Sequence, residues 1–77
     1  MKTIDKKFLE KNTRIKNALF KADIKTYEKL IKYDYRWLYY NLKNIGRVSL
    51  TKIHKHLINK GYDGIKNYEK YSKSPTF

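Results

Sequence analysis

The stretch LYYNLKNIGRVSLTKIHKHL, residues 38–57, decides the fold. Apolar residues recur every three or four positions on both sides of a short break, which is the spacing of one buried helix face: Leu38, Leu42, Leu50, Ile53 and Leu57. The break is Asn44-Ile45-Gly46, and Asn and Gly both tolerate the positive φ that a sharp reversal often needs. The stretch therefore predicts a helix, a three-residue turn and a second helix.

Shorter helices are predicted on the N-terminal side of this stretch. A helix is expected from about Thr13 to Ala22, capped by Asn12 or Thr13. Thr26 and Asp34 are the expected N-caps of two further helices. The residues expected on the buried faces are Ile15, Ala18, Leu19, Ala22, Ile24, Tyr27, Leu30, Ile31, Tyr35 and Tyr39.

The last helix is expected from about Arg47 to Lys60, ended by a C-cap glycine at Gly61.

The pattern predicts an all-α fold, a compact bundle of four to five short helices with a helix-hairpin-helix-like turn. We expect an N-terminal arm over residues 1–11, a helical domain over 12–61, and a C-terminal extension over 62–77 that is partly docked and then disordered.

The composition favours a polyanionic partner. The chain has 77 residues, enough for one domain, with 19 Lys+Arg against 7 Asp+Glu and a net charge of +12. A domain so basic attracts nucleic acid first and an anionic membrane surface second. It contains no cysteine, which excludes disulfides and Cys-containing zinc sites. Its richness in Lys, Asn, Ile and Tyr indicates an AT-rich genome.

The sequence favours a protein that acts outside membranes and without catalysis. No apolar run approaches the roughly 18 residues of a spanning helix, and none follows the N-terminal lysines as in a signal peptide. We find no phosphate-binding glycine loop, no paired carboxylates and no Ser-His arrangement. His54 and His56, two apart on a helix, point to different sides and cannot share a metal ion. We expect a cytoplasmic protein that is no enzyme and has no cofactor, metal or membrane partner.

Two blocks of the chain follow the pattern of a known family. The first block consists of Arg14, Asn17, Ala18, Leu19, Ile24, Thr26, Leu30 and Ile31. The second and more specific block is Asn44-Ile45-Gly46-Arg47-Val48-Ser49-Leu50-Thr51-Lys52-Ile53, closed by Leu57 and Gly61. Together, the two blocks resemble the C-terminal domain of the bacterial RNA polymerase alpha subunit, and the resemblance extends from Arg14 to Gly61. The chain departs from the family at Val48, where the family has a lysine, and at Lys52, where it has a glutamate.

The resemblance implies a specific mode of DNA binding. In the family, the first helix and the turn bind the minor groove, so Arg14 is expected to enter the groove. Asn44, Gly46 and Ser49 are expected to hold phosphates with support from Asn17. Arg47 and Lys52 would add attraction that is independent of sequence. The implied partner is AT-rich double-stranded DNA, and the implied process is transcription by a standalone copy of the domain, of phage, plasmid or bacterial origin.

Helix geometry supports the same face. Arg14, Asn17 and Lys21 lie at i, i+3 and i+7, on one polar side of the first helix. The turn at residues 44–46 is expected to present the free N–H groups of the last helix toward an anion. The polar side of that helix is expected to carry Ser49, Lys52, His56 and Asn59.

Other interpretations are open at this stage. Arg14 and Lys52 can be solvated surface residues, and the turn can be no more than a turn. A second hypothesis is an interaction module that mimics the polymerase domain and binds sigma factor, an activator or RNA polymerase. A third is an RNA or ribosome binder. Aromatic residues can stack on single-stranded bases or form a protein-binding patch; those without core spacing are Tyr33, Trp37, Tyr40, Tyr68 and Tyr71.

Overall fold

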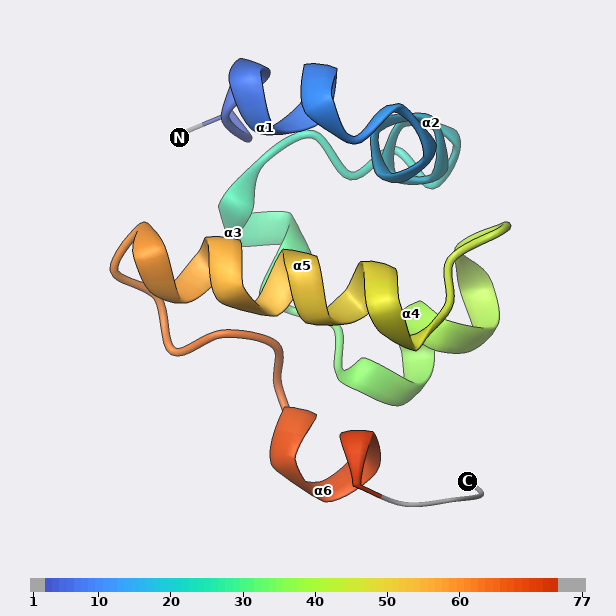
Figure 1. The fold of residues 1–77 in the computed structure, drawn as a ribbon, viewed down its shortest axis with the longest axis vertical. Helices are drawn as coiled ribbons and strands as arrows, with labels where there is room; N and C mark the ends of the chain where they lie inside the picture. Colours follow the sequence, from blue (N-terminus) through green and yellow to red (C-terminus); the bar gives the residue numbers. More distant parts are fainter. Residues whose placement is uncertain (1–2, 74–77) are drawn as a thin grey trace.

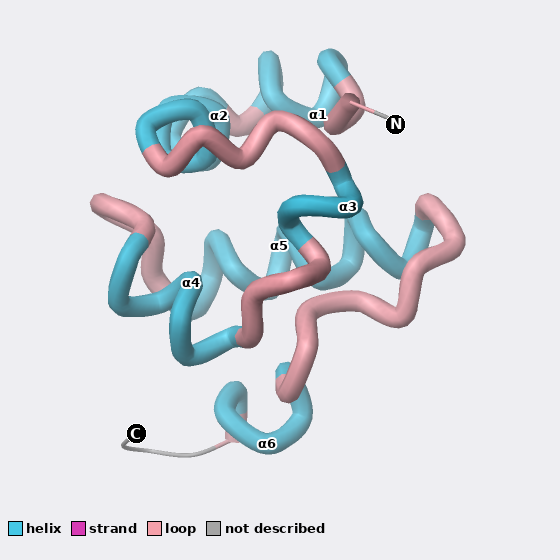
Figure 2. The backbone as a smooth tube through the Cα atoms, turned by 180° about the vertical axis from the view of Figure 1, so that it is seen from behind, coloured by secondary structure: helices cyan, strands magenta, loops and turns pink. Residues whose placement is uncertain are grey.

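The computed structural model describes residues 3–73, and this part of the chain is all-helical (Figure 1). Its helices are α1 (Lys6–Lys11), α2 (Thr13–Lys21), α3 (Tyr27–Leu30), α4 (Tyr35–Asn41), α5 (Arg47–Asn59) and α6 (Tyr68–Ser72). The longest, α5, crosses the middle of the molecule with α1 and α2 on one side and α6 on the other. Figure 2 shows α3 and α4 covering α5 from behind. The expected all-α bundle is confirmed.

The core forms around the inner face of α5. Leu50, Ile53 and Leu57 have no exposed surface, as the helical spacing predicts. The predicted apolar faces of the other helices are also buried, with few exceptions, and each buried side chain of this size contributes about 1.5–3 kcal/mol. Ile31 is 36% exposed because it is the C-cap of the single-turn helix α3. Ala22 and Tyr39 are only partly buried.

Two of the predicted helix caps are present. The Thr26 side chain accepts a hydrogen bond from the Lys29 amide, 3.2 Å away. The Asp34 carboxylate accepts one from the Trp37 amide at 2.8 Å. Asn12 stands at the N-cap position of α2, but its side chain makes no capping bond and instead donates to the Phe8 carbonyl at 2.8 Å. The difference arises because α1 ends directly before α2, and its carbonyls compete for that side chain.

The expected N-terminal arm is part of the helical domain over residues 3–11. Asp5 caps α1 by accepting from the Lys7 amide. Ile4 and Leu9 are buried in the core. The Ile4 amide donates to the Lys25 carbonyl at 3.2 Å, which ties the start of the chain to the segment before α3. Six residues with one buried leucine give no periodic signal, so the sequence pattern missed this helix.

The C-terminal extension is docked over residues 62–73. Gly61 has a φ of +92° and ends α5 as predicted. Ile65 is buried, and the Tyr35 amide donates to the Lys66 carbonyl at 2.9 Å. The chain then forms α6. The predicted disordered tail, residues 74–77, lies outside the described residues.

Candidate nucleic-acid interface

A polar hollow of about 250 Å³ lies between α2 and the loop that joins α4 to α5. Figure 1 shows this loop rising toward α2. We call it the cationic hollow, and it is lined by Arg14, Asn17, Ala18, Lys21, Lys43 and Asn44. The structure thus brings the predicted Arg14 of α2 and Asn44 of the predicted Asn-Ile-Gly turn to one surface.

The α2 side of the hollow follows from helix geometry. Ile15 and Leu19 are buried and fix the inner face of α2. Arg14, Asn17 and Lys21 are exposed on its other side. Their side chains are therefore directed outward along one edge of the hollow.

The loop side of the hollow depends on one buried residue and one unusual backbone angle. Ile45 is 6% exposed and anchors the loop in the core. Asn44 has a φ of +60°, which an asparagine adopts more readily than most residues. Gly46 instead has an extended φ of −108° and serves as N-cap of α5, so the expectation of positive φ applies to Asn44 alone.

The surface above Gly46 is open. A Cβ atom at this position would meet no other atom within 4 Å. Gly46 is the N-cap of α5 and has no side chain, so the N-cap residue makes no capping bond to the first amide groups of the helix. A ligand can therefore approach this backbone closely, and amides at a helix start favour an anion.

The charges around the cationic hollow are of one sign. It is lined by three cations, Arg14, Lys21 and Lys43, and over residues 3–73 no carboxylate lines it. The ion pairs found in that range join Asp5 to Lys60, Asp23 to Lys25 and Lys29, and Glu69 to Lys73. They leave the three cations of the hollow available to a polyanion.

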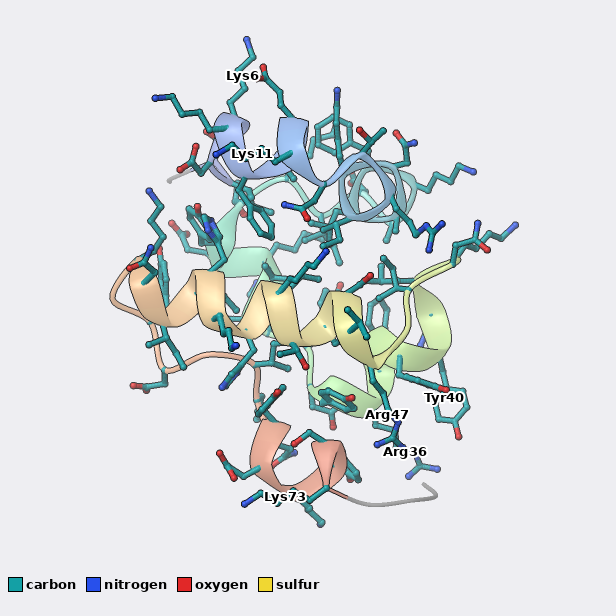
Figure 3. All side chains as sticks on the ribbon, in the orientation of Figure 1. Lys6, Lys11, Arg36, Tyr40, Arg47 and Lys73 are labelled. Atoms are coloured by element: carbon teal, nitrogen blue, oxygen red, sulfur yellow. The ribbon has the colours of Figure 1, made fainter. Side chains whose placement is uncertain are left out.

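Four predicted site residues, in α5 or at its N-cap, do not line this hollow: Gly46, Arg47, Ser49 and Lys52. The Arg47 side chain donates to the Ser72 carbonyl at 3.2 Å and lies over the Tyr39 ring. Figure 3 shows it directed away from α2 and toward α6. Ser49 and Lys52 share the side of α5 that carries His56, which faces α1. The Lys52 charge can add to the positive electrostatic potential around the hollow from a longer distance.

The two histidines of α5 hold opposite sides of the molecule. His56 stacks on Phe8 of α1 with ring centroids 4.0 Å apart, so it is packed rather than exposed on the polar side as expected. His54 stacks on Tyr68 of α6 at 3.6 Å. Across residues 3–73 no group of three His, Asp or Glu side chains is placed to hold a metal ion.

Both histidines form a hydrogen bond through a ring nitrogen. His54 Nδ1 accepts from the Ile65 amide at 2.9 Å. The Tyr27 hydroxyl oxygen accepts from the Asp5 amide and is also hydrogen-bonded to His56 Nε2 at 2.7 Å. Burial is the main cause that lowers the pKa of His54 and the pKa of His56 below the usual value.

A second hollow, of about 310 Å³, contains two of the aromatic residues left open by the sequence. We call it the aromatic hollow, and it is lined by Lys32, Tyr33, Asp34, Trp37, Lys66 and Asn67. The rings of Tyr33 and Trp37 stack with centroids 3.9 Å apart. Tyr68 packs against His54 and Tyr35 instead, and Tyr40 is 60% exposed on α4. Of these aromatic residues, Tyr33 and Trp37 therefore share one hollow, and Tyr68 packs elsewhere.

Comparison of this chain with known proteins identifies no relative. No protein-family model matches the chain, and neither a curated protein nor a solved structure is detectably similar to it. The resemblance to the polymerase domain stays a prediction. In the described part of the chain, no helix is both long and apolar enough to cross a membrane. The geometry and charge of the two hollows are therefore the features of the molecule that bear most directly on its function.

Proposed function

We propose that this protein binds double-stranded DNA without catalysing a reaction, and that it prefers AT-rich sites. The observation that carries the proposal is the placement of Arg14 and Lys21 opposite Lys43 and Asn44 across one open hollow. This arrangement offers a guanidinium, two ammonium groups and an amide side chain to the same ligand. Such a set matches a phosphate backbone beside a groove.

Arg14 is the proposed groove-entering residue. AT-rich tracts narrow the minor groove and deepen its negative potential, which attracts an inserted cation. A guanidinium is less strongly hydrated than an ammonium, so an arginine loses less on leaving water. Arg14 is exposed at the rim of the hollow, where this insertion needs no rearrangement of the core.

The start of α5 is the proposed phosphate contact. Gly46 leaves the backbone open, and the amides of the first turn of a 13-residue helix carry the positive end of its dipole. Asn44 and Lys43 precede Gly46 in the chain by two and three residues and line the hollow. Asn17 supports from α2. Arg47 contributes less because its side chain donates to Ser72, and Ser49 and Lys52 contribute less because they share the side of α5 that faces α1.

The resemblance to the polymerase domain extends the proposal to a process. We place the DNA binding in transcription, in the cytoplasm, with RNA polymerase or sigma factor as a further partner. This extension depends on the Arg14–Gly61 resemblance and not on the geometry of the hollow.

The proposal is tested by NMR titration with an AT-rich duplex and by one matched pair of variants. Amides around Arg14, Asn17, Asn44 and Gly46 should shift. Arg14→Ala should weaken duplex binding about tenfold and reduce the slope of log affinity against log salt by about 1. Arg36→Ala is the control, since Arg36 is exposed on α4 and does not line the hollow. Equal losses in the two variants would contradict the proposal, because they would show attraction by net charge alone.

A further inference from the structure

We infer that the aromatic hollow is a second binding site, which takes a base of single-stranded nucleic acid against the Tyr33–Trp37 stack and its phosphates on Lys32 and Lys66. The inference does not rest on the proposed duplex function. Figures 1 and 2 show α2 and α6 at opposite ends of the molecule. Residues of α2 line the cationic hollow, whereas the aromatic hollow is lined in part by Asn67, which directly precedes α6.

The aromatic pair provides the stacking surface. Tyr33 and Trp37 are nearly parallel, with an interplanar angle of 15° and centroids 3.9 Å apart. Both are partly buried, so their orientation is fixed by packing while part of each ring reaches the hollow. Every nucleobase has a flat π-face, and stacking on an aromatic side chain contributes about 1–3 kcal/mol per base.

The cations come from two segments that the backbone holds together. Lys32 follows α3, and Lys66 belongs to the segment before α6. Asp34 and Lys66 form an isolated parallel β-bridge, and the Tyr35 amide donates to the Lys66 carbonyl at 2.9 Å. Asn67 then turns the chain with a φ of +60°. Two lysines are thereby fixed beside one aromatic stack.

The charge balance favours an anionic ligand. Asp34 is the single carboxylate among the described residues that line the hollow, and its side chain already accepts the Trp37 amide as a helix cap. Lys32 and Lys66 are exposed and outnumber it. A volume of about 310 Å³ falls within the range of sites for small molecules.

The combination of rings and cations selects the kind of nucleic acid. In a duplex the bases are stacked on each other and their faces are not available to a protein ring. In a single strand the bases are unstacked, and the phosphates follow at each step. An acidic peptide would use the lysines but would gain nothing specific from a flat aromatic face.

Trp37 is the single tryptophan of the chain, so its fluorescence reports on this hollow alone. The experiment titrates the full chain with single-stranded eight-residue oligonucleotides of one sequence, as DNA and as RNA. Saturable quenching of Trp37 is expected with at least one of them. Inorganic polyphosphate of matched charge and the corresponding duplex should leave the fluorescence almost unchanged. Equal quenching by polyphosphate or by duplex would overturn the inference, and so would oligonucleotide binding that leaves Trp37 unquenched.

Variants separate stacking from charge. Tyr33→Ala should weaken single-strand binding about tenfold, in line with the loss of one stacked base. Tyr40→Ala, at an exposed aromatic position outside the hollow, is the matched control and should leave the affinity within twofold of wild type. Equal effects of the two variants would overturn the inference.

Lys66→Ala, at an exposed residue, tests the inference even if circular dichroism shows that Tyr33→Ala does not fold. Lys66→Ala should reduce the slope of log single-strand affinity against log salt by about 0.7, the value for one phosphate contact on a single strand. An unchanged slope would overturn the inference. Arg14→Ala should leave the quenching of Trp37 intact, so failure of the duplex proposal and failure of this one give different results.

Discussion

The two sides of α5 present different chemistry to a ligand. On the side of α2, the cationic hollow has three cations, and over residues 3–73 no aromatic ring lines it. On the side of α6, the aromatic hollow combines two lysines with a stacked Tyr33–Trp37 pair. A net charge of +12 attracts any polyanion to both. For the two proposed ligands, shape and ring content rather than charge distinguish the cationic hollow from the aromatic hollow.

Two glycines show the same contrast between the sides. Gly46, at the N-cap of α5 and two residues after Asn44, has an extended backbone and open space where a Cβ would be. Gly64, on the α6 side, has a φ of +91°, and a Cβ there would overlap the His54 ring. The first glycine leaves a surface open for a partner, and the second allows two segments of the protein to pack closely.

The largest effect is expected from Gly64→Ala. The substitution places a side chain in the left-handed region and forces it against His54, so it should lower the free energy of unfolding by about 3 kcal/mol. Urea denaturation followed by circular dichroism measures this. The quenching of Trp37 by single strands should weaken as well, since Ile65 and Lys66 follow directly. A stability within about 0.5 kcal/mol of wild type would show that His54 moves aside without cost.

A pair of charge reversals should separate the two hollows. Lys43→Glu should weaken duplex binding about tenfold and leave single-strand binding almost unchanged, because it introduces a like charge beside a phosphate. Lys66→Glu should have the opposite pattern. Fluorescence anisotropy with both labelled ligands gives all four affinities. If each variant weakens both ligands alike, the two hollows act as one diffuse positive field.

Acidification should loosen both sides of α5. Burial lowers the pKa of His54 and of His56 in the folded state, so the unfolded chain binds more protons and stability falls as pH drops below about 6.5. The loss is complete once pH is below the folded pKa values. Protonation of His54 Nδ1 removes the acceptor of a part-buried hydrogen bond from the Ile65 amide, worth about 1 kcal/mol.

The pH effect is measured by urea denaturation at pH 7.5 and pH 5.5. His54→Asn and His56→Gln are informative variants because their side-chain amides approximate the hydrogen-bonded ring nitrogens and do not titrate. Each should remove part of the pH dependence. An unchanged pH dependence in the double variant would assign the effect to other groups.

The smallest effect on stability is expected from Gly46→Ala. The backbone angle suits alanine and the space is open, so the free energy of unfolding should change by about 0.5 kcal/mol or less. Duplex affinity should nevertheless fall about threefold, since a methyl group holds a phosphate away from the helix start. The shift in melting temperature measures the change in stability, and a titration with duplex DNA measures the change in affinity. Unchanged duplex affinity would remove Gly46 from the proposed interface.

The sequence predicted the parts of the fold that depend on local spacing. The inner faces of α2, α4 and α5 follow from apolar periodicity, and the caps at Thr26 and Asp34 from their short-range hydrogen bonds. Helix α1 was missed because its stability comes from distant contacts, such as the stack of Phe8 on His56. Six residues carry too little local propensity to indicate a helix on their own.

The candidate sites show the same limit. Helical spacing predicted that Arg14, Asn17 and Lys21 share one face of a helix. The family resemblance predicted that the turn at residues 44–46 lies on the same surface. Arg47 was misplaced because its direction depends on α6, which the sequence indicated only as an extension. The aromatic hollow requires Lys66 beside Asp34, and this backbone bridge between distant segments has no counterpart in any local pattern.

The position of α1 constrains the order in which the chain folds. Asp5 forms an ion pair with Lys60 at 3.0 Å, and Phe8 stacks on His56 near the same end of α5. A helix of six residues is too short to persist alone in water. The Ile4–Lys25 bond can hold this segment beside the start of α3 before α5 exists. The contacts of Asp5 and Phe8 become available only after α5 has been synthesised, so full docking of α1 follows the synthesis of α5.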